Sequence, residues 1–237
     1  MRDKPLIGLS TGKSKQMIIA RYREGLRWLK LINNIPYIVY DKGDKNSPDH
    51  LPNIPRFPIE RFGGIKHAKS PTGRESHTYL YHILKYYDQL ADMNIFLQGN
   101  PVEFACDAKS TLRALLQNDF EGVDFLSLNG PLVICDKVAS PLHRGLPMER
   151  IFTRLFKNDC PDLFAYTWGA MFCVSKAYIH RRPRAFYEEM MQIIYDEPLS
   201  GYIFERLWPT ILACHNYIPH DSYPPKDIAS WQLPRFP

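Results

Sequence analysis

Short β-type runs alternate with helix-forming segments along most of this chain, and this alternation restricts the fold more than any other feature. Apolar runs predict strands at residues 16–22, 35–40, 93–97, 123–128 and 166–174, with a further short strand at 56–59. Helical spacing of apolar residues predicts helices at 24–32, 74–87, 107–118, 148–156, 175–180, 183–195 and 202–214. Strands that alternate with helices are typical of a mostly parallel sheet covered on both faces. We therefore predict an α/β fold, Rossmann-like, in which helices flank the sheet.

The composition fits one domain over residues 1–237 and excludes several other classes of protein. Of the 237 residues, 45% are hydrophobic, which is enough for a core, and the net charge is +5. No block of like charges resembles a nucleic-acid-binding tail, and no apolar run is long enough to span a membrane. The five cysteines are widely spaced without a C-x-x-C pair, so we expect neither a disulfide framework nor a zinc site. Because the first residues also lack the apolar run of a signal peptide, we expect a cytoplasmic protein that binds no nucleic acid.

Three familiar catalytic motifs are absent from the sequence. The stretch GLSTGKS at 8–14 has three residues between its glycines where a phosphate-binding P-loop has four, and a strand-like run follows it instead of a helix. No H-E-x-x-H pair and no G-x-S-x-G elbow occur. His77 and His82 lie five residues apart on one predicted helix, a spacing that favours structural roles for both.

Polar residues follow the predicted strands at the points where open α/β sheets bind ligands. The first strand ends in Ala20, Arg21 and Tyr22, and the second is followed by Asp41. The segment GRESHTYL places Arg74 at a helix N-terminus, where the backbone N–H groups already favour anions. Each feature also has a structural explanation, namely a surface turn at the first strand and a capping box of Thr72 with Glu75 at the helix.

The stretch NIFLQGNP at 94–101 raises the sharpest question. Its apolar run stops at the polar but uncharged turn of Gln98, Gly99 and Asn100. Carboxylates bind Mg²⁺ far better than neutral amide oxygens do, so two amides at a strand end argue against a simple metal site.

Together, the blocks GRESHTYL, FLQGNP, WGAMF and FERLW resemble those of a family of uncharacterised proteins with the same block order, which in turn is similar to the GT-A nucleotide-sugar glycosyltransferases. The resemblance covers about residues 16–210. It implies a single GT-A-like domain with a nucleotide-binding part at about 16–128, an acceptor part at about 129–215 and an extended tail at 216–237. The implied activity is transfer of a sugar from a nucleoside-diphosphate sugar, with a UDP-sugar favoured, to a carbohydrate acceptor.

The resemblance also implies roles for individual residues. The donor would contact Ala20, Arg21, Tyr22, Asp41, Arg74, Gln98 and Asn100, while Trp168 and Gly169 would contact the acceptor. The turn after NIFL takes the place of the usual Asp-x-Asp, which holds Mn²⁺ or Mg²⁺, so a metal is possible but the motif does not support one.

Without a metal, basic side chains would have to stabilise the leaving diphosphate. Besides Arg21 and Arg74, the candidates are Arg181, Arg182, Arg184, Lys226 and Arg235. An inverting transfer needs a base, for which Glu205 is preferred over Asp196 and Glu197. A salt bridge of Glu205 with Arg206 is the structural alternative, and Asp119 with Glu121 is a further acidic pair. The alternative function is a non-catalytic glycan- or nucleotide-binding protein that retains the fold.

Overall fold

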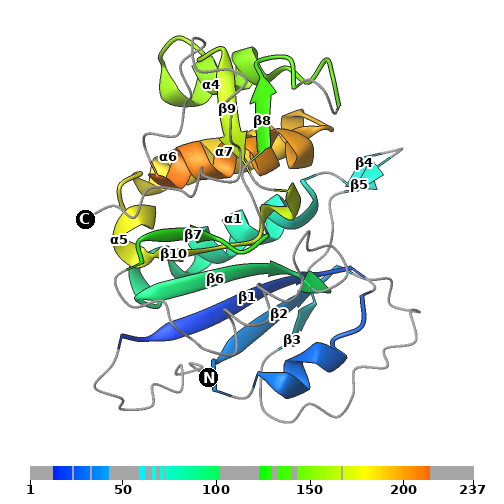
Figure 1. Ribbon diagram of the computed structural model, residues 1–237, viewed down its shortest axis with the longest axis vertical. Helices are drawn as coiled ribbons and strands as arrows, with labels where there is room; N and C mark the ends of the chain where they lie inside the picture. Colours follow the sequence, from blue (N-terminus) through cyan, green and yellow to red (C-terminus); the bar gives the residue numbers. More distant parts are fainter. Residues whose placement is uncertain are drawn as a thin grey trace.

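The protein is built around a six-stranded mixed sheet with the order β3-β2-β1-β6-β10-β7 (Figure 1). The computed structural model describes residues 13–22, 24–32, 34–42, 59–61, 66–67, 70–71, 73–101, 123–129, 133–139, 143–166 and 168–213. The parallel strands are β1 (Lys15–Arg21), β2 (Tyr37–Asp41), β3 (Ile59–Arg61) and β6 (Met93–Gln98). Strand β10 (Phe172–Ser175) runs antiparallel to β6 and to β7 (Phe125–Ser127). The predicted α/β class is therefore confirmed, with a mixed sheet that is mostly parallel.

The strand order contains one reversal, and its position matters for function. From β1 the chain moves outward through β2 to β3, and it then returns to the other side of β1 as β6. Ligands of open α/β sheets bind beyond the carboxyl ends of the strands at such a switch point. Here that point lies between β1 and β6.

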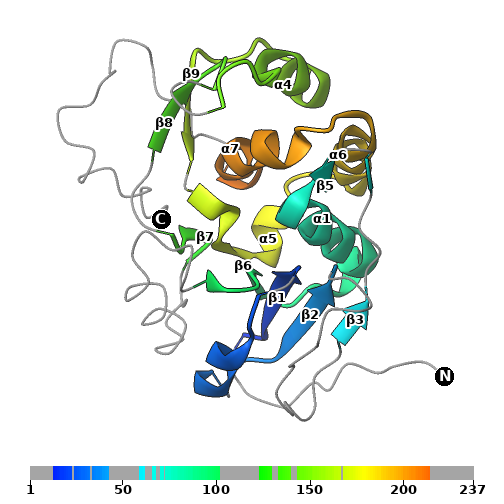
Figure 2. The ribbon, with the colours of Figure 1, turned by 90° about the vertical axis from the view of Figure 1, so that its right-hand side faces the viewer.

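Helices cover one face of the sheet and carry a further layer. These helices are α1 (Arg74–Tyr86), α5 (Lys176–Ile179), α6 (Arg184–Asp196) and α7 (Ser200–Ala213). Beyond α7 lie the paired strands β8 (Val133–Asp136) and β9 (Leu163–Tyr166) with α4 (Met148–Phe156), as Figure 2 shows from the side. The remaining elements are short: η1 (Arg27–Leu31), η2 (Tyr87–Gln89), η3 (Trp168–Ala170), β4 (Lys66–His67) and β5 (Ser70–Pro71).

The side chains of β1 alternate between two hydrophobic clusters, one on each face of the sheet. Ile18 and Ala20 join the cluster formed with α1, α6 and α7, whereas Met17 and Ile19 join the cluster formed with η1. Because both faces are covered, β1 reads in the sequence as a continuous apolar run.

The elements differ from the sequence prediction in three places. The helix predicted at 24–32 is the short η1, because residues 24–26 adopt an irregular path. The strand predicted at 166–174 is wrong: β9 and β10 belong to different sheets, and a turn at Trp168–Ala170 separates them. Strands β8 and β9 were not predicted. The helix predicted at 107–118 and the tail at 216–237 lie outside the described residues.

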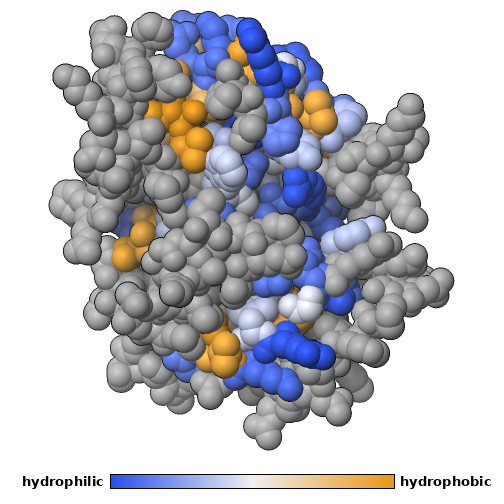
Figure 3. Space-filling view, turned by 45° about the vertical axis from the view of Figure 1, so that its right-hand side comes forward, coloured by the Kyte–Doolittle hydropathy of each residue, from blue (hydrophilic) through white to orange (hydrophobic). Residues whose placement is uncertain are grey.

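The face seen in Figure 3 is mostly hydrophilic over its described part, with smaller hydrophobic patches. Among the described residues, no helix combines the length and the apolar character needed to cross a membrane.

Candidate functional site

The carboxyl ends of the parallel strands meet at one edge of the sheet. Arg21, the last residue of β1, lies beside Asp41, the last residue of β2, and Ala20 lies beside Gln98 at the end of β6. Strand β10 is antiparallel, so its first residue, Phe172, lies at this same edge. The turn that precedes β10 therefore lies against the end of β6, at the same edge of the sheet as the ends of β1 and β2.

Arg21 and Asp41 form a buried ion pair that ties the ends of β1 and β2 together. Their side chains are 4% and 6% exposed, and Arg21 Nη1 lies 2.7 Å from Asp41 Oδ2. The Nε of Arg21 also donates to the carbonyl oxygen of Glu24 at 2.9 Å. The structure thus brings two predicted donor-binding residues together, but as partners of each other.

Glu24 links the end of β1 to the end of β6. Its carboxylate accepts a hydrogen bond from the backbone N–H of Tyr22 at 2.7 Å. A Cβ on Gly99 would come within 2.6 Å of Glu24 Oε2, so a larger residue at this position would have to displace the Glu24 side chain. The indole of Trp28 donates to the carbonyl oxygen of Gly99 at 2.8 Å. These contacts fix the turn after β6, while the ring of Tyr22 stays exposed.

The turn at Trp168–Ala170 is held by side chains from three different elements. Gln98 Nε2 donates to the carbonyl oxygen of Gly169 at 2.8 Å. Asn129, which follows β7, donates its amide to the carbonyl oxygen of Trp168. The backbone N–H of Gly169 donates to Glu205 Oε1 of α7 at 2.6 Å. The arrangement unites the predicted residues Gln98, Trp168, Gly169 and Glu205.

This turn has an unusual backbone. Gly169 has a φ of 75° and Ala170 a φ of 47°, so both lie in the left-handed region. A non-glycine residue in that region costs about 1–2 kcal/mol and persists where the surroundings hold it in place. The three hydrogen bonds described above supply that constraint, and the ring of Trp168 is left 42% exposed.

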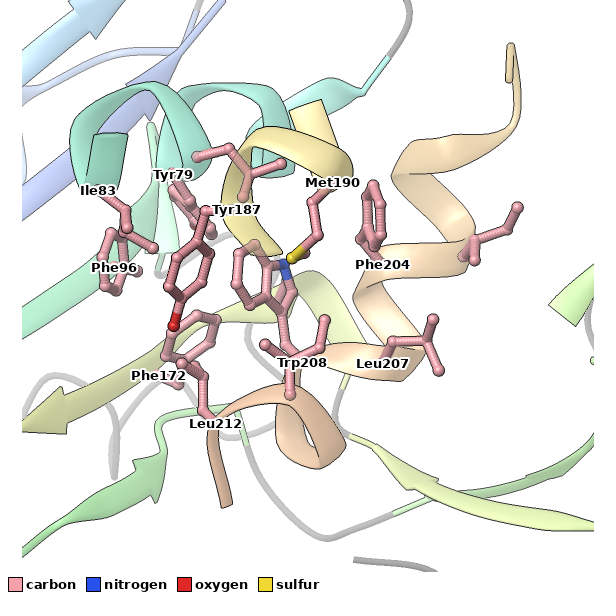
Figure 4. Packing of buried hydrophobic residues seen from close by; sticks show 14 of the residues in the cluster. Tyr79, Ile83, Phe96, Phe172, Tyr187, Met190, Phe204, Leu207, Trp208 and Leu212 are labelled. Carbon is pink, nitrogen blue, oxygen red and sulfur yellow. The ribbon is translucent and has the colours of Figure 1, made fainter. Parts of the chain in front are cut away.

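Packing in the core places α7, and with it Glu205. Trp208 is buried against Tyr79 and Phe172, and its indole donates to Ser76 Oγ at 3.0 Å (Figure 4). Pro209 has no N–H, so the carbonyl of Glu205 lacks the helical hydrogen bond it would otherwise accept.

A buried cation lies behind the carboxylate of Glu205. Arg206 is 1% exposed, its Nη1 lies 3.6 Å from Glu205 Oε2, and it donates to the carbonyl oxygen of Tyr202 at 2.8 Å. Its guanidinium also lies over the ring of Tyr166 and contacts His143. The salt bridge predicted as the structural alternative for Glu205 is therefore present, alongside the hydrogen bond from Gly169.

The start of α1 adds charged groups beside α7, the helix that carries Glu205. Gly73, with a φ of 73°, is the N-cap of α1. Thr72, the other member of the predicted capping box, lies outside the described residues. The exposed Arg74 lies over the ring of Tyr202 and has its Nε 3.7 Å from Glu75 Oε2. Lys42, which follows β2, donates its ammonium group to the carbonyl oxygen of Arg74.

Burial shifts the pKa values of these groups toward neutrality. It raises the pKa of Glu75 to about 7, with Arg74 opposing the shift and Glu205 adding to it. Burial also lowers the pKa of Lys42 to about 8, which Glu75 opposes. Groups that titrate near neutral pH are suited to proton transfer and cluster at functional sites.

Several predicted charges lie elsewhere. Arg181, Arg182 and Arg184 follow β10 and α5 at the opposite edge of the sheet, where the N–H of Lys176 bonds to the carbonyl oxygen of Asp92. Their predicted contact with a leaving group at the carboxyl edge is therefore wrong. Asp196 and Glu197 pair with Arg154 and Arg150. Asp119, Glu121, Lys226 and Arg235 lie outside the described residues, and Asn100 is half-buried beside Gly99.

Sequence reasoning missed two groups of residues at this site. Lys42 and Glu75 were visible only as parts of a turn and of a helix start. Asn129 did have a signal, because LSLNGP at 126–131 resembles FLQGNP at 96–101: in both, an apolar run is followed by an amide residue and a glycine, with a proline shortly after. In the described residues, no group of three or more histidine, cysteine, aspartate or glutamate side chains is arranged to hold a metal ion.

One family model matches residues 17–223, and it is described as "Protein of unknown function (DUF3431)". The chain belongs to this family. No curated protein matches the sequence, and no solved structure matches it either. The family model spans the strands of the described sheet, the Trp168–Ala170 turn and α7, but its description names no activity.

Proposed function

We propose that this DUF3431 protein is a glycosyltransferase that moves a sugar from a nucleoside-diphosphate sugar, with a UDP-sugar favoured, to a hydroxyl group of a carbohydrate. The observation that carries the proposal is the convergence of polar residues at the switch point of the sheet. There the end of β6 bonds to the Trp168–Ala170 turn, the turn bonds to Glu205, and the ends of β1 and β2 lie at the same edge of the sheet. The resemblance to GT-A enzymes supplies the proposed reaction, and we propose that this chain also has the GT-A fold.

The two predicted parts of the chain would contribute different sides of this site. The nucleotide would lie over the ends of β1 and β2, where the exposed ring of Tyr22 offers a surface for stacking a base. The diphosphate would lie toward Arg74 and Lys42, which bring two cations to the start of α1. Trp168 would provide a platform for one face of the acceptor sugar.

Glu205 is the proposed base. The acceptor hydroxyl would attack the anomeric carbon, the bond from that carbon to the diphosphate would break, and the hydroxyl proton would pass to Glu205. One carboxylate oxygen is held by the Gly169 N–H, while Oε2 lies 3.6 Å from Arg206. A fixed carboxylate of this kind can be aimed at an acceptor bound on Trp168.

The leaving diphosphate develops negative charge, which Arg74 and Lys42 would stabilise without a metal ion. Gln98 Nε2 donates a hydrogen bond to the carbonyl oxygen of Gly169, and an ionised, metal-binding carboxylate at position 98 could not donate this bond. We therefore propose a metal-independent transfer, in which activity persists in excess chelator. Loss of activity in chelator would show that a metal ion takes part.

One observation favours the alternative of a binding protein without catalysis. Glu205 is only 16% exposed and has both of its carboxylate oxygens near other groups of the protein. In that case the protein would bind a nucleotide or a glycan, and it would not hydrolyse or transfer any donor.

A panel of nucleoside diphosphates and UDP-sugars tests the proposal. Thermal unfolding measured with UDP, GDP and ADP, each with and without Mn²⁺, should give a higher Tm with at least one of them. Slow hydrolysis of the matching sugar donor should follow. If no nucleotide raises the Tm, the proposed function is refuted. If a nucleotide binds but no donor is hydrolysed or transferred, the binding protein is the correct alternative.

The variant Glu205→Gln separates binding from chemistry. We expect it to keep the nucleotide-induced rise in Tm and to lose turnover by about 10²–10⁴-fold, the usual contribution of a positioned base. Glu188→Gln is the matched control, since Glu188 is exposed and pairs with Arg184 on its own helix. Unchanged turnover in Glu205→Gln would remove this residue from the mechanism.

A further inference from the structure

Three backbone polar groups of the turn that carries Trp168 are hydrogen-bonded to side chains. The carbonyl oxygen of Trp168 accepts from Asn129, the carbonyl oxygen of Gly169 accepts from Gln98, and the N–H of Gly169 donates to Glu205. The three side chains come from the end of β7, the end of β6 and the middle of α7. Ends of strands and a packed helix are rigid supports, so the turn is fixed from three directions.

The direction of each hydrogen bond explains the residue type at each position. A carbonyl oxygen can only accept, so the groups that face Trp168 and Gly169 must donate, and an amide does so at every pH. An ionised carboxylate at 98 or 129 would place its lone pairs against a carbonyl oxygen. Conversely, the Gly169 N–H needs an acceptor, which the carboxylate of Glu205 supplies. The amides in FLQGNP and LSLNGP thus follow from the needs of the turn.

The space around the turn is equally restricted. A Cβ on Gly169 would lie 2.9 Å from Asn129 Nδ2 and 3.3 Å from Gln98 Nε2, so both amides press against this glycine. Ala170, with its φ of 47°, follows directly and is buried. Backbone strain at this level is retained only where neighbouring groups enforce it.

We propose that Asn129 and Gln98 are positioning residues that fix the conformation of the Trp168–Ala170 turn. By fixing the turn, they hold the exposed Trp168 ring and the Glu205 carboxylate in the relative positions that an acceptor sugar requires. The statement that these residues serve acceptor binding rests on the proposed function, whereas the statement that they fix the conformation of the turn does not. Gln98 then acts on the acceptor side, through Gly169, in place of the metal ligand that the GT-A comparison suggests at its position. Because Gly169 bonds to both Gln98 and Glu205, a displaced turn would move the platform and the base together.

Replacing Asn129 by aspartate gives a test with a built-in rescue. At pH 8 the new carboxylate is ionised and repels the Trp168 carbonyl, so the turn is displaced. When the carboxyl group is protonated in acid, its O–H can donate to the same carbonyl, and the native turn returns. Asn129→Leu has a similar shape but can never donate, so it stays defective at both pH values. Among the described residues, the titratable and charged groups of the surrounding elements include Lys42, Arg74, Glu75, His143, Glu205 and Arg206, and they are common to both variants.

The measurement is acrylamide quenching of Trp168 fluorescence at pH 8 and pH 4. The signal of Trp168 is obtained by subtracting that of the matching variant that also carries Trp168→Phe, because the chain has four tryptophans. We expect Asn129→Asp to shift the equilibrium between the held and displaced turn by about tenfold at pH 8, which corresponds to about 1.4 kcal/mol. Because a tenfold penalty on the ionised form raises the pKa of the introduced carboxyl group by about one unit, from about 3.9 to about 5, we expect most of this shift to be reversed at pH 4. Should Asn129→Asp fail to fold at pH 8, Gln98→Glu with its control Gln98→Met makes the same test at the Gly169 carbonyl.

Two results would overturn the proposal: wild-type quenching in Asn129→Asp at pH 8, or identical behaviour of Asn129→Asp and Asn129→Leu at both pH values. Binding of UDP is followed in parallel by the rise in Tm, and we expect Asn129→Asp to keep it. In transfer assays with a panel of oligosaccharides, Asn129→Asp should raise the KM for the acceptor at pH 8 without changing the KM for the donor, and a purely structural role would not produce that split. Acid rescue of the turn without any nucleotide binding in the wild type would refute the proposed function alone, whereas nucleotide binding without acid rescue would refute the positioning role alone.

Discussion

Glu75 provides the most direct test of the electrostatics at this site. Burial raises its pKa from an ordinary value of 4.5 to about 7. A raised carboxyl pKa means that the folded state favours the protonated form, so this contribution to stability is full below pH 4.5 and is lost as the pH rises through 7. Over that window the loss amounts to on the order of 3 kcal/mol, since each pKa unit corresponds to about 1.4 kcal/mol.

The variant Glu75→Gln keeps the shape and the neutral state of the protonated side chain but cannot ionise. We therefore expect it to be more stable than the wild type at pH 8, by on the order of 3 kcal/mol, with a small difference at pH 5. The free energies of unfolding come from urea titrations followed by circular dichroism, with the slope m compared to confirm the same unfolded state. Only the difference between variant and wild type is informative, because buried histidines change stability in the opposite direction below pH 6.5.

Glu188→Gln serves as the control, because Glu188 is an exposed partner of Arg184 and its removal should have a small effect that does not vary with pH. The reasoning is refuted if the difference between Glu75→Gln and the wild type is the same at pH 5 and pH 8. A variant less stable than the wild type at pH 8 would be equally contrary, because it would mean that the attraction of Glu75 to Arg74 and Lys42 outweighs the cost of burial.

Two further predictions concern residues away from the proton-transfer groups. Asp41→Asn should destabilise the protein by about 3–5 kcal/mol in urea titrations, because it leaves the buried Arg21 charge uncompensated. The double variant Arg21→Met with Asp41→Leu should recover much of this loss. Equal losses of stability in the single and the double variant would contradict the prediction. Burial lowers the pKa of His82 from 6.5 to about 3, so its contribution to stability is present above pH 6.5 and is lost as the pH falls toward 3. His82→Gln, which can still accept the hydrogen bond from Tyr40, should lose less stability than the wild type between pH 6.5 and pH 4, and parallel pH profiles would refute the assignment.

The local elements were predictable to the extent that a local pattern determines them. Strands β1 and β6 are continuous apolar runs because both faces of the sheet are covered, and α1 and α6 have apolar residues at helical spacing. The run at 166–174 was misassigned because a single stretch of apolar residues conceals the left-handed turn at Gly169 and Ala170. That turn is enforced by partners 36 to 71 residues away, which no local pattern contains.

The sequence by itself determined the alternation of strands and helices, and therefore which residues end the strands and can face a ligand. It also determined that position 98 is an amide. Only the tertiary structure decided what that amide does, because the direction of its hydrogen bond depends on the carbonyl of Gly169. The same holds for Arg21 and Asp41, which the fold pairs with each other, and for Glu75, whose pKa is raised by burial that depends on how α1 packs. Charge and hydrogen-bonding capacity are properties of the residue, but partners and burial are properties of the fold.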